Sequence, residues 1–161
     1  MRKTLIAYFS ASGVTAAAAQ TLAKESGAAL YEIRPAEKYT RADLDWTNKR
    51  SRSSLEMQNP ASRPALADHD APVKACERML LGFPIWWGVA PTLVNSFLEA
   101  YDLSGKEIVL FATSGGSGFG HTAAALESSC PGAKLREGKL FVGRPSPAAL
   151  REWAQALKDM D

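Results

Sequence analysis

A chain of 161 residues can bury roughly two thirds of the surface that its unfolded form exposes, so we expect a single domain spanning residues 1–161 that folds without disulfides or a metal. Hydrophobic residues make up 46% and charged residues 22%, which excludes a disordered chain. The net charge is only +2 and no basic stripe alternates with aromatics, which argues against a nucleic-acid partner.

Short apolar runs alternate with Ala- and Leu-rich stretches along the chain. In chain order we predict a strand at 3–9, a helix at 15–25, strands at 29–34 and 78–83, a helix at 91–101, a strand at 106–112, a helix at 121–129, a strand at 134–142 interrupted near Gly138, and a helix at 147–158 capped by Ser146. This alternation predicts an α/β fold in which helices cover a five-stranded parallel sheet.

Residues 36–70 interrupt the alternation, because more than forty residues separate the second and third strands. The stretch carries six Lys or Arg, six Asp or Glu, and the aromatic residues Tyr39 and Trp46. A short helix capped by Thr40 is predicted within Thr40–Ser54. The stretch is a solvated extension, a lid beside the active site or part of a homodimer contact, and the sequence leaves these alternatives open.

The loop after the first strand has the composition of a phosphate site. Ser10, Ser12 and Thr15 offer hydroxyls, Gly13 permits a tight turn, and Val14 adds an amide at the positive end of the next helix. The loop lacks both the Gly-Lys-Ser/Thr of a nucleotide-binding P-loop and the three glycines of a dinucleotide site. An ordinary helix N-cap is the alternative interpretation.

The loop after the third strand is aromatic. It reads Pro84, Ile85, Trp86, Trp87 and Gly88. Two adjacent tryptophans at the end of a strand point to opposite sides, so both cannot lie in the core. Such residues suit a flat aromatic ligand, and Gly88 lets backbone approach that ligand. The alternative is one core tryptophan beside one that is partly exposed.

The loop after the fourth strand is rich in glycine and hydroxyl groups between positions 113 and 120. Ordering so many glycines is costly, and a mere connection would not need them. Their exposed amides suit the polar edge of a uracil-like ring. The candidate ligand residues here are Thr113, Ser114, Gly115, Gly116, Ser117 and Gly118.

Neither a metal site nor a membrane segment is predicted. Cys76 and Cys130 have no C-x-x-C spacing and no histidine partners. The apolar run at 4–9 is too short for a signal peptide, and no segment approaches the roughly 20 apolar residues of a membrane span. We therefore expect a soluble cytoplasmic protein that contacts no membrane.

The three loops, together with Asp43–Trp46 and Ser51–Ser54, resemble a branch of the bacterial flavodoxin-like proteins over essentially the whole chain. The specific runs are Gly82–Gly88 and Thr113–Gly120. The resemblance implies a three-layer sandwich with strand order 2-1-3-4-5 and an extended connection between the second and third strands. It implies FMN as cofactor, with its phosphate at 10–15, its ribityl chain and ring at 84–88, and the ring edge at 113–118.

Two departures from the family pattern bear on function. Val14 stands where flavodoxins commonly carry Asn, which removes one side-chain contact but keeps the backbone amide. Familiar flavodoxin carriers are strongly acidic, whereas this chain is slightly basic, which weakens docking to basic redox partners through an acidic face.

Three functions follow from these observations. The first is one- or two-electron transfer through FMN to a redox partner protein. The second is an NAD(P)H-dependent FMN oxidoreductase that acts on a quinone or another small flat acceptor. The third, a binding module without redox chemistry, is disfavoured because all three loops keep residues suited to the ligand. No catalytic side chain is predicted, because the flavin itself carries the redox chemistry.

Overall fold

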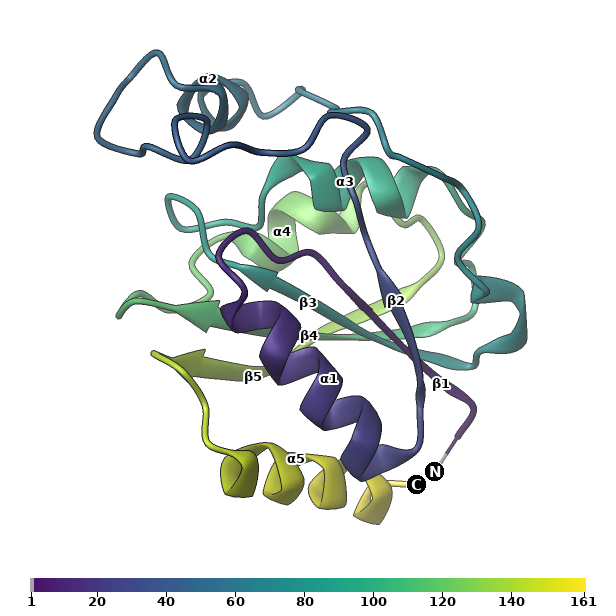
Figure 1. The fold of residues 1–161 in the computed structure, drawn as a ribbon. Helices are drawn as coiled ribbons and strands as arrows, with labels where there is room; N and C mark the ends of the chain where they lie inside the picture. Colours follow the sequence, from purple (N-terminus) through teal and green to yellow (C-terminus); the bar gives the residue numbers. More distant parts are fainter. Residues whose placement is uncertain (1) are drawn as a thin grey trace.

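The computed structural model describes residues 2–161, which form one parallel sheet in the order β2-β1-β3-β4-β5 (Figure 1). The strands are β1 (Thr4–Tyr8), β2 (Ala29–Glu32), β3 (Arg78–Pro84), β4 (Glu107–Ser114) and β5 (Lys134–Val142). The helices are α1 (Val14–Ser26), α2 (Arg52–Gln58), α3 (Thr92–Glu99), α4 (Thr122–Glu127) and α5 (Pro147–Asp159), with a 3-10 turn, η1, at Val73–Ala75. Helices α1 and α5 cover one face of the sheet, and α3 and α4 cover the other. The predicted three-layer fold and strand order are confirmed.

Alternate residues of the central strands build two separate cores. Ile6 and Leu80 face α1 and α5, whereas Leu5 and Leu81 face α3 and α4, and all four side chains are at most 1% exposed. A parallel sheet covered on both faces needs apolar residues at consecutive positions. This requirement explains the continuous apolar runs in the sequence.

Two local predictions at the carboxyl half of the chain are confirmed. The pairing of β4 with β5 shifts register between Leu110 and Phe111, which pair with Glu137 and Lys139 and leave Gly138 unpaired. Helix α5 begins as expected, because the Ser146 side chain accepts a hydrogen bond from the Ala149 amide at 3.1 Å. Both features were visible in local sequence because each depends on a single turn or bulge residue.

The helix predicted within Thr40–Ser54 is wrong. The helix of this region is α2, which begins after Ser51, and the Ser51 side chain accepts from the Ser54 amide. Thr40 does form a reciprocal cap, since its hydroxyl accepts from the Asp43 amide at 3.1 Å and Asp43 accepts from the Thr40 amide at 2.9 Å. Only turns follow this cap, because short polar side chains in the stretch bond nearby backbone amides and compete with helical pairing.

The stretch from 36 to 70, called the insertion below, is tied to the rest of the molecule. Its two ends pair with each other, since the Ala36 amide donates to Ala65 and the Ala67 amide donates to Arg34, each at 2.8 Å. Arg63 also binds Glu99 on α3 at 2.9 Å. The insertion accordingly lies beyond α3, with α2 on the outer side of that layer (Figure 1).

The opposite, amino edge of the sheet holds a buried charge. Arg78 is 1% exposed, and its guanidinium contacts Asp161 at 2.5 Å and Glu107 at 3.5 Å. Glu107 also binds Arg2 at 2.7 Å, so this cluster joins the two ends of the chain. Within the described part of the chain, no helix combines the length and hydrophobicity that crossing a membrane requires.

Candidate functional site

The three predicted loops meet at the carboxyl edge of the sheet, because β1, β3 and β4 are neighbours. We call residues 10–15 loop 1, residues 84–88 loop 2 and residues 113–120 loop 3. Loops 1 and 3 are joined by a hydrogen bond of 2.8 Å between the hydroxyls of Thr15 and Thr113. Loops 2 and 3 are joined because the Ile85 amide donates to the Thr113 carbonyl at 3.1 Å. The strand order thus brings all three candidate segments into one site.

Loop 1 ends in a helix start that no side chain caps. Gly13 occupies the N-cap position with a φ of 95°, in the left-handed region, and makes no side-chain capping bond. Its own amide donates to the Ser10 hydroxyl at 3.1 Å, which tightens the turn. The first amides of a helix have no intrahelical acceptor, so those of Val14 and Thr15 remain open to an external one. Ser12 and Gly13 lie exposed beside them.

Thr15 differs from the other hydroxyl residues of loop 1. It is 2% exposed, and Thr113, its hydrogen-bond partner, is 5% exposed. Both hydroxyls are therefore engaged with each other beneath the surface. They fix loop 1 against β4, whereas Ser10 and Ser12 lie nearer to solvent.

Loop 2 is a tight hairpin turn that places its two tryptophans in different environments. Trp86 and Val89 pair through two backbone hydrogen bonds, of 2.8 and 3.3 Å. Between them, Trp87 and Gly88 both have positive φ, of 52° and 77°, as a type I′ turn requires. A positive φ is unusual for a residue as bulky as tryptophan. Trp87 is 52% exposed and Trp86 is half-buried against the core, so the two tryptophans do not both lie in the core.

Loop 3 folds around the Ser114 side chain, which is buried. The Ser114 hydroxyl donates to the Ser117 carbonyl at 2.6 Å and accepts from the Gly116 amide at 3.0 Å. Gly115 and Gly118 are exposed and carry no side chain over the site. The end of the loop rests on loop 2, where the His121 amide donates to the Gly88 carbonyl at 3.0 Å. Pro84, at the end of β3, pairs with Thr113 and completes the contact.

An aromatic cluster that the sequence did not reveal packs against Trp86 of loop 2. The rings of Phe9, Tyr39 and Trp86 lie 5.6–5.7 Å apart, centroid to centroid. The Arg52 guanidinium lies 3.9 Å from the centroid of the Tyr39 ring and binds Glu56 at 3.0 Å. Burial, and then a hydrogen bond to Glu56, raises the pKa of Tyr39, so its phenol stays neutral and donates. Nothing in local sequence signals this cluster, because its members come from three distant segments.

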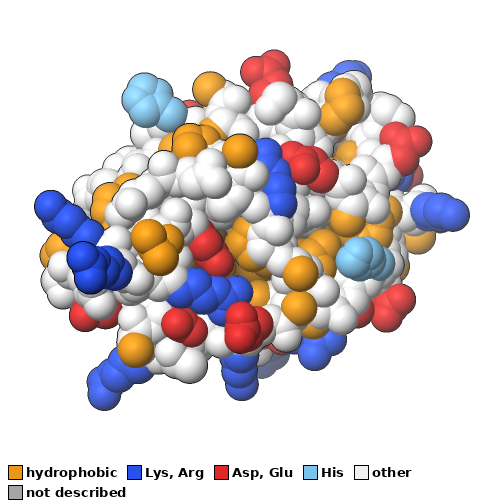
Figure 2. Space-filling model, turned by 90° about the horizontal axis from the view of Figure 1, so that it is seen from above, with side chains coloured by type: hydrophobic (Ala, Val, Ile, Leu, Met, Phe, Trp, Pro, Cys, Tyr) orange, Lys and Arg blue, Asp and Glu red, His pale blue; other side chains and the backbone are white. Residues whose placement is uncertain are grey.

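Two cavities flank this cluster. One, of about 540 Å³, is bordered by Ser10 of loop 1, by Arg34 and by Lys38, and Phe9 and Tyr39 also line it. The other, of about 350 Å³, is called the Trp86 cavity. Its lining residues come from the insertion and loop 2 and are Leu44, Trp46, Ser53, Ile85, Trp86 and Trp87. The insertion therefore forms part of the rim. Viewed from above, this side of the molecule mixes hydrophobic groups with charges of both signs (Figure 2).

Comparison with known proteins identifies this arrangement. The sequence profile of the flavodoxin family matches residues 3–157, nearly the whole chain. The chain belongs to the flavodoxin family. No curated protein matches it. The parallel α/β fold and its strand order are thus the fold of the flavodoxin family.

Two solved structures are similar along their full length. A proposed flavoprotein from Bacteroides eggerthii is 45% identical, with 98% of this chain and 99% of that chain covered and a TM-score of 0.87. A proposed flavoprotein from Bacteroides uniformis is 44% identical, with 96% and 98% covered and a TM-score of 0.89. A flavoprotein from Lactobacillus acidophilus, solved in complex with FMN, shares the fold at 20% identity, with 96% and 99% covered and a TM-score of 0.70.

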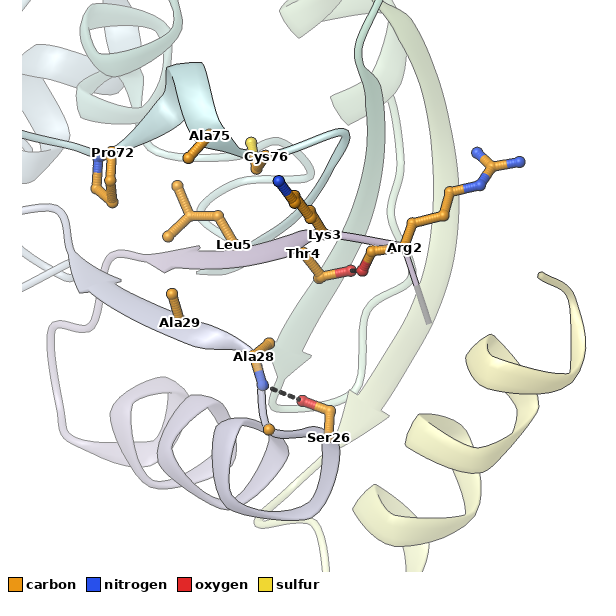
Figure 3. Close-up of a pocket in the computed structure, with 11 residues that line it drawn as sticks. Arg2, Lys3, Thr4, Leu5, Ser26, Ala28, Ala29, Pro72, Ala75 and Cys76 are labelled. Carbon is orange, nitrogen blue, oxygen red and sulfur yellow. Dashed lines mark hydrogen bonds between the residues drawn. The ribbon is translucent and has the colours of Figure 1, made fainter.

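A further cavity, of about 350 Å³, lies at the amino ends of β1 and β2, on the side of the sheet opposite the three loops. Figure 3 shows Leu5, Ala29, Pro72 and Ala75 around it, while Arg2 points away from it. Arg2 is engaged with Glu107. This flavodoxin relative accordingly offers few polar groups that converge on a ligand at its amino edge.

The cysteines lie apart from the site. Cys76 and Cys130 are buried and unpaired by disulfides, and burial raises the pKa of both thiols. Over residues 2–161, no group of three or more His, Cys, Asp or Glu side chains is arranged to hold a metal ion. Loops 1, 2 and 3 themselves therefore offer hydroxyls, backbone amides and aromatic rings, and Arg34 and Lys38 lie beside Ser10 at the border of the neighbouring cavity.

Proposed function

We propose that this member of the flavodoxin family binds FMN at the three loops and transfers electrons through it. The observation that carries the proposal is the uncapped start of α1, which opens onto Ser10 and Ser12 at the carboxyl edge of the sheet. A phosphate group supplies the acceptors that the first helical amides lack, and the helix dipole favours its charge. The FMN complex of the Lactobacillus acidophilus protein, which has the same fold, supports this choice of ligand.

In this proposal the Trp86 cavity and loop 3 hold the flavin ring. Trp86 and Trp87 supply apolar surface, and the exposed amides of Gly115 and Gly118 supply donors for the polar edge of the ring. FMN, when bound, supplies the redox chemistry, while the protein residues bind, orient and partly shield it. The Thr15–Thr113 pair and the Phe9–Tyr39–Trp86 cluster keep the binding segments in register with one another.

One observation favours the second candidate, an NAD(P)H-dependent oxidoreductase with a small flat acceptor. Trp46, from the insertion, is 72% exposed and borders the Trp86 cavity together with loop 2. A large aromatic residue that stays exposed at the rim of a cofactor site is expected where a small aromatic substrate binds. It is not expected where the insertion is only a solvated extension. An electron carrier would instead pass its electrons to a redox partner protein at the same edge.

Ligand titration tests the cofactor. We expect FMN to bind much more tightly than riboflavin, because only FMN places a phosphate at the start of α1. We expect FAD to bind more weakly than FMN, since the composition of loop 1 suits one terminal phosphate and includes no second site for an adenylate. Equal affinities for FMN and riboflavin would show that loop 1 contributes no phosphate site and would overturn the proposal.

Anaerobic reduction then separates the two candidate activities. Bleaching of the bound flavin by NADH or NADPH supports the oxidoreductase. Lack of reaction with either nucleotide, combined with stepwise one-electron reduction in a redox titration, supports the carrier. The same purified protein serves for both measurements, so the two results can be compared directly.

A further inference from the structure

A second cavity, of about 610 Å³, lies next to the Trp86 cavity and shares Trp46 and Trp87 with it as walls. We call it the Lys49 cavity. Its lining residues are Trp46, Thr47, Lys49, Ser54, Met57, Gln58 and Trp87. All but Trp87 belong to the insertion, and the volume lies in the range of small-molecule sites. The insertion thus builds a pocket of its own beside the site proposed for the flavin ring.

The walls of the Lys49 cavity suit a planar ring. Trp46 is 72% exposed and Trp87 is 52% exposed, so both indoles present open aromatic surface. Trp87 is held there by a backbone conformation with positive φ, which is unusual for such a bulky residue. Strained residues of this kind concentrate at binding sites, where the surrounding structure holds them in place. Met57 adds a polarisable side chain that adapts to aromatic ligands.

The charge of the cavity is positive. Lys49 is the only charged residue among those that line it, and its side chain has no acidic partner within residues 2–161. The carboxylates of the neighbouring segments are already engaged. Asp45 accepts from Thr47, Glu56 accepts from Arg52, and Asp43 accepts from Thr40. None of these carboxylates forms an ion pair with the Lys49 ammonium, which can therefore pair with an anion from solution.

Hydrogen bonds within the insertion already fix the backbone around the Lys49 cavity before any ligand binds. The Gln58 side chain on α2 donates to the Lys49 carbonyl at 3.0 Å, which ties the loop to the helix. The Asn48 side chain accepts from the Arg50 amide at 3.0 Å, and the Ser51 amide donates to the Asn48 carbonyl at 3.0 Å. Backbone fixed in this way loses little conformational entropy when a ligand binds.

We infer that the Lys49 cavity binds a planar aromatic ring that carries an anionic group. A ring between or against the two indoles accounts for their exposure, and a carboxylate or sulfonate on that ring pairs with Lys49. The role of this ligand as the electron acceptor rests on the proposed function, in its oxidoreductase form, whereas the binding itself does not. The substrates of this class are aromatic anions, as opposed to neutral or cationic flat molecules.

Calorimetric titration of the FMN-saturated protein with naphthalenesulfonate tests the inference. We expect saturable binding by one site, and much weaker binding of methanesulfonate, which has the same charge without the ring, and of naphthol, which has the ring without the charge. Lys49→Gln should weaken naphthalenesulfonate binding by about threefold to tenfold, the range expected for one charged partner. Lys74→Gln is the matched control, because Lys74 is an exposed lysine on η1 that does not line the cavity.

Three results would overturn the inference. They are equal binding of methanesulfonate and naphthalenesulfonate, equal effects of Lys49→Gln and Lys74→Gln, and competition between FMN and naphthalenesulfonate, which would assign the cavity to the flavin itself. Titration of each variant with FMN keeps the two proposals apart. Failure of FMN to bind, with naphthalenesulfonate still bound in a Lys49-dependent way, contradicts the proposed function and leaves the anion site standing.

Discussion

Helices α1 and α5 are both 13 residues long, pack against each other on the same face of the sheet, and begin at its carboxyl edge. Their first turns nevertheless differ. Ser146 caps α5 with its own side chain, whereas Gly13 starts α1 without a cap, although serines stand at positions 10 and 12. The same fold therefore contains one helix start that is satisfied internally and one that is left open. This difference supports our proposal that the open helix start receives the phosphate of the ligand.

The largest expected effect comes from Gly13→Val. Gly13 has a φ of 95°, and a β-branched residue cannot adopt this conformation without strain. A Cβ at this position would meet no atom within 4 Å, so the effect comes from the backbone and not from a clash. We expect FMN affinity to fall by about 100-fold or more, which corresponds to about 3 kcal/mol. Equilibrium titration of the variant and the parent protein with FMN measures this change in affinity.

Gly143→Val is the control for this substitution. Gly143 precedes α5 and has a φ of 71°, and a Cβ added there would likewise meet no atom within 4 Å. The same strain is then introduced beside the capped helix. We expect a similar loss of unfolding free energy and little change in FMN affinity. Equal loss of FMN affinity in both variants would indicate general destabilisation and would remove the distinction between the two helix starts.

Ser12→Ala should weaken FMN binding by about 1.5–3 kcal/mol, the usual contribution of a hydrogen bond to a charged oxygen. Ser12 is exposed beside the start of α1, so the substitution should leave the fold intact. Riboflavin affinity should not change, since riboflavin lacks the phosphate. An equal loss for both ligands would place Ser12 away from the phosphate.

Lower pH should weaken FMN binding by a smaller factor. Loop 1 contains no Lys, Arg or His, so within this loop only neutral dipoles would hold the proposed phosphate, and they would favour its dianion. The second phosphate pKa lies near about 6, so the dianion is lost as pH falls through that value. We expect up to about a tenfold loss of affinity between pH 7.5 and 5, as the dianion falls to about one tenth. Riboflavin affinity measured over the same pH range provides the reference.

The smallest effect on the ligand is expected from Ser146→Ala. Removing the cap of α5 should lower the unfolding free energy by about 1 kcal/mol, and denaturant unfolding measures this change. FMN affinity should stay the same, because α5 is satisfied by its own serine. A loss of FMN affinity as large as that of Ser12→Ala would contradict the division of roles between the two helices.

Most of the fold could be predicted from sequence, because β1, β3 and β4 are runs of apolar residues and each of these runs ends at a recognisable turn. The helix in the insertion could not, since Thr40 and Ser51 are both good caps within one polar stretch. The choice between them depends on tertiary contacts of α2, such as Arg52 with Tyr39, and on local side-chain bonds that break the helix after Thr40.

Some features of the candidate site could likewise be recognised in the sequence, and others could not. Loops 1, 2 and 3 were recognisable because their compositions are unusual for plain connections, and parallel strands bring their carboxyl ends to one edge. The aromatic cluster was not recognisable, since Phe9, Tyr39 and Trp86 belong to segments far apart in the chain. The same holds for the buried Thr15–Thr113 pair, which is separated by 98 positions.

The sequence by itself determined the five strands, the helices α1, α3, α4 and α5, the parallel α/β class, the cap of α5 and the three polar or aromatic loops, because these depend on residues within a few positions of one another. Only the tertiary structure decided that α1 is left uncapped, that Trp86 rests on Phe9 and Tyr39, and that Trp46 and Lys49 of the insertion stand beside loop 2. These features depend on which distant segments share a surface. That choice is made by packing over the whole sheet and not by any local pattern.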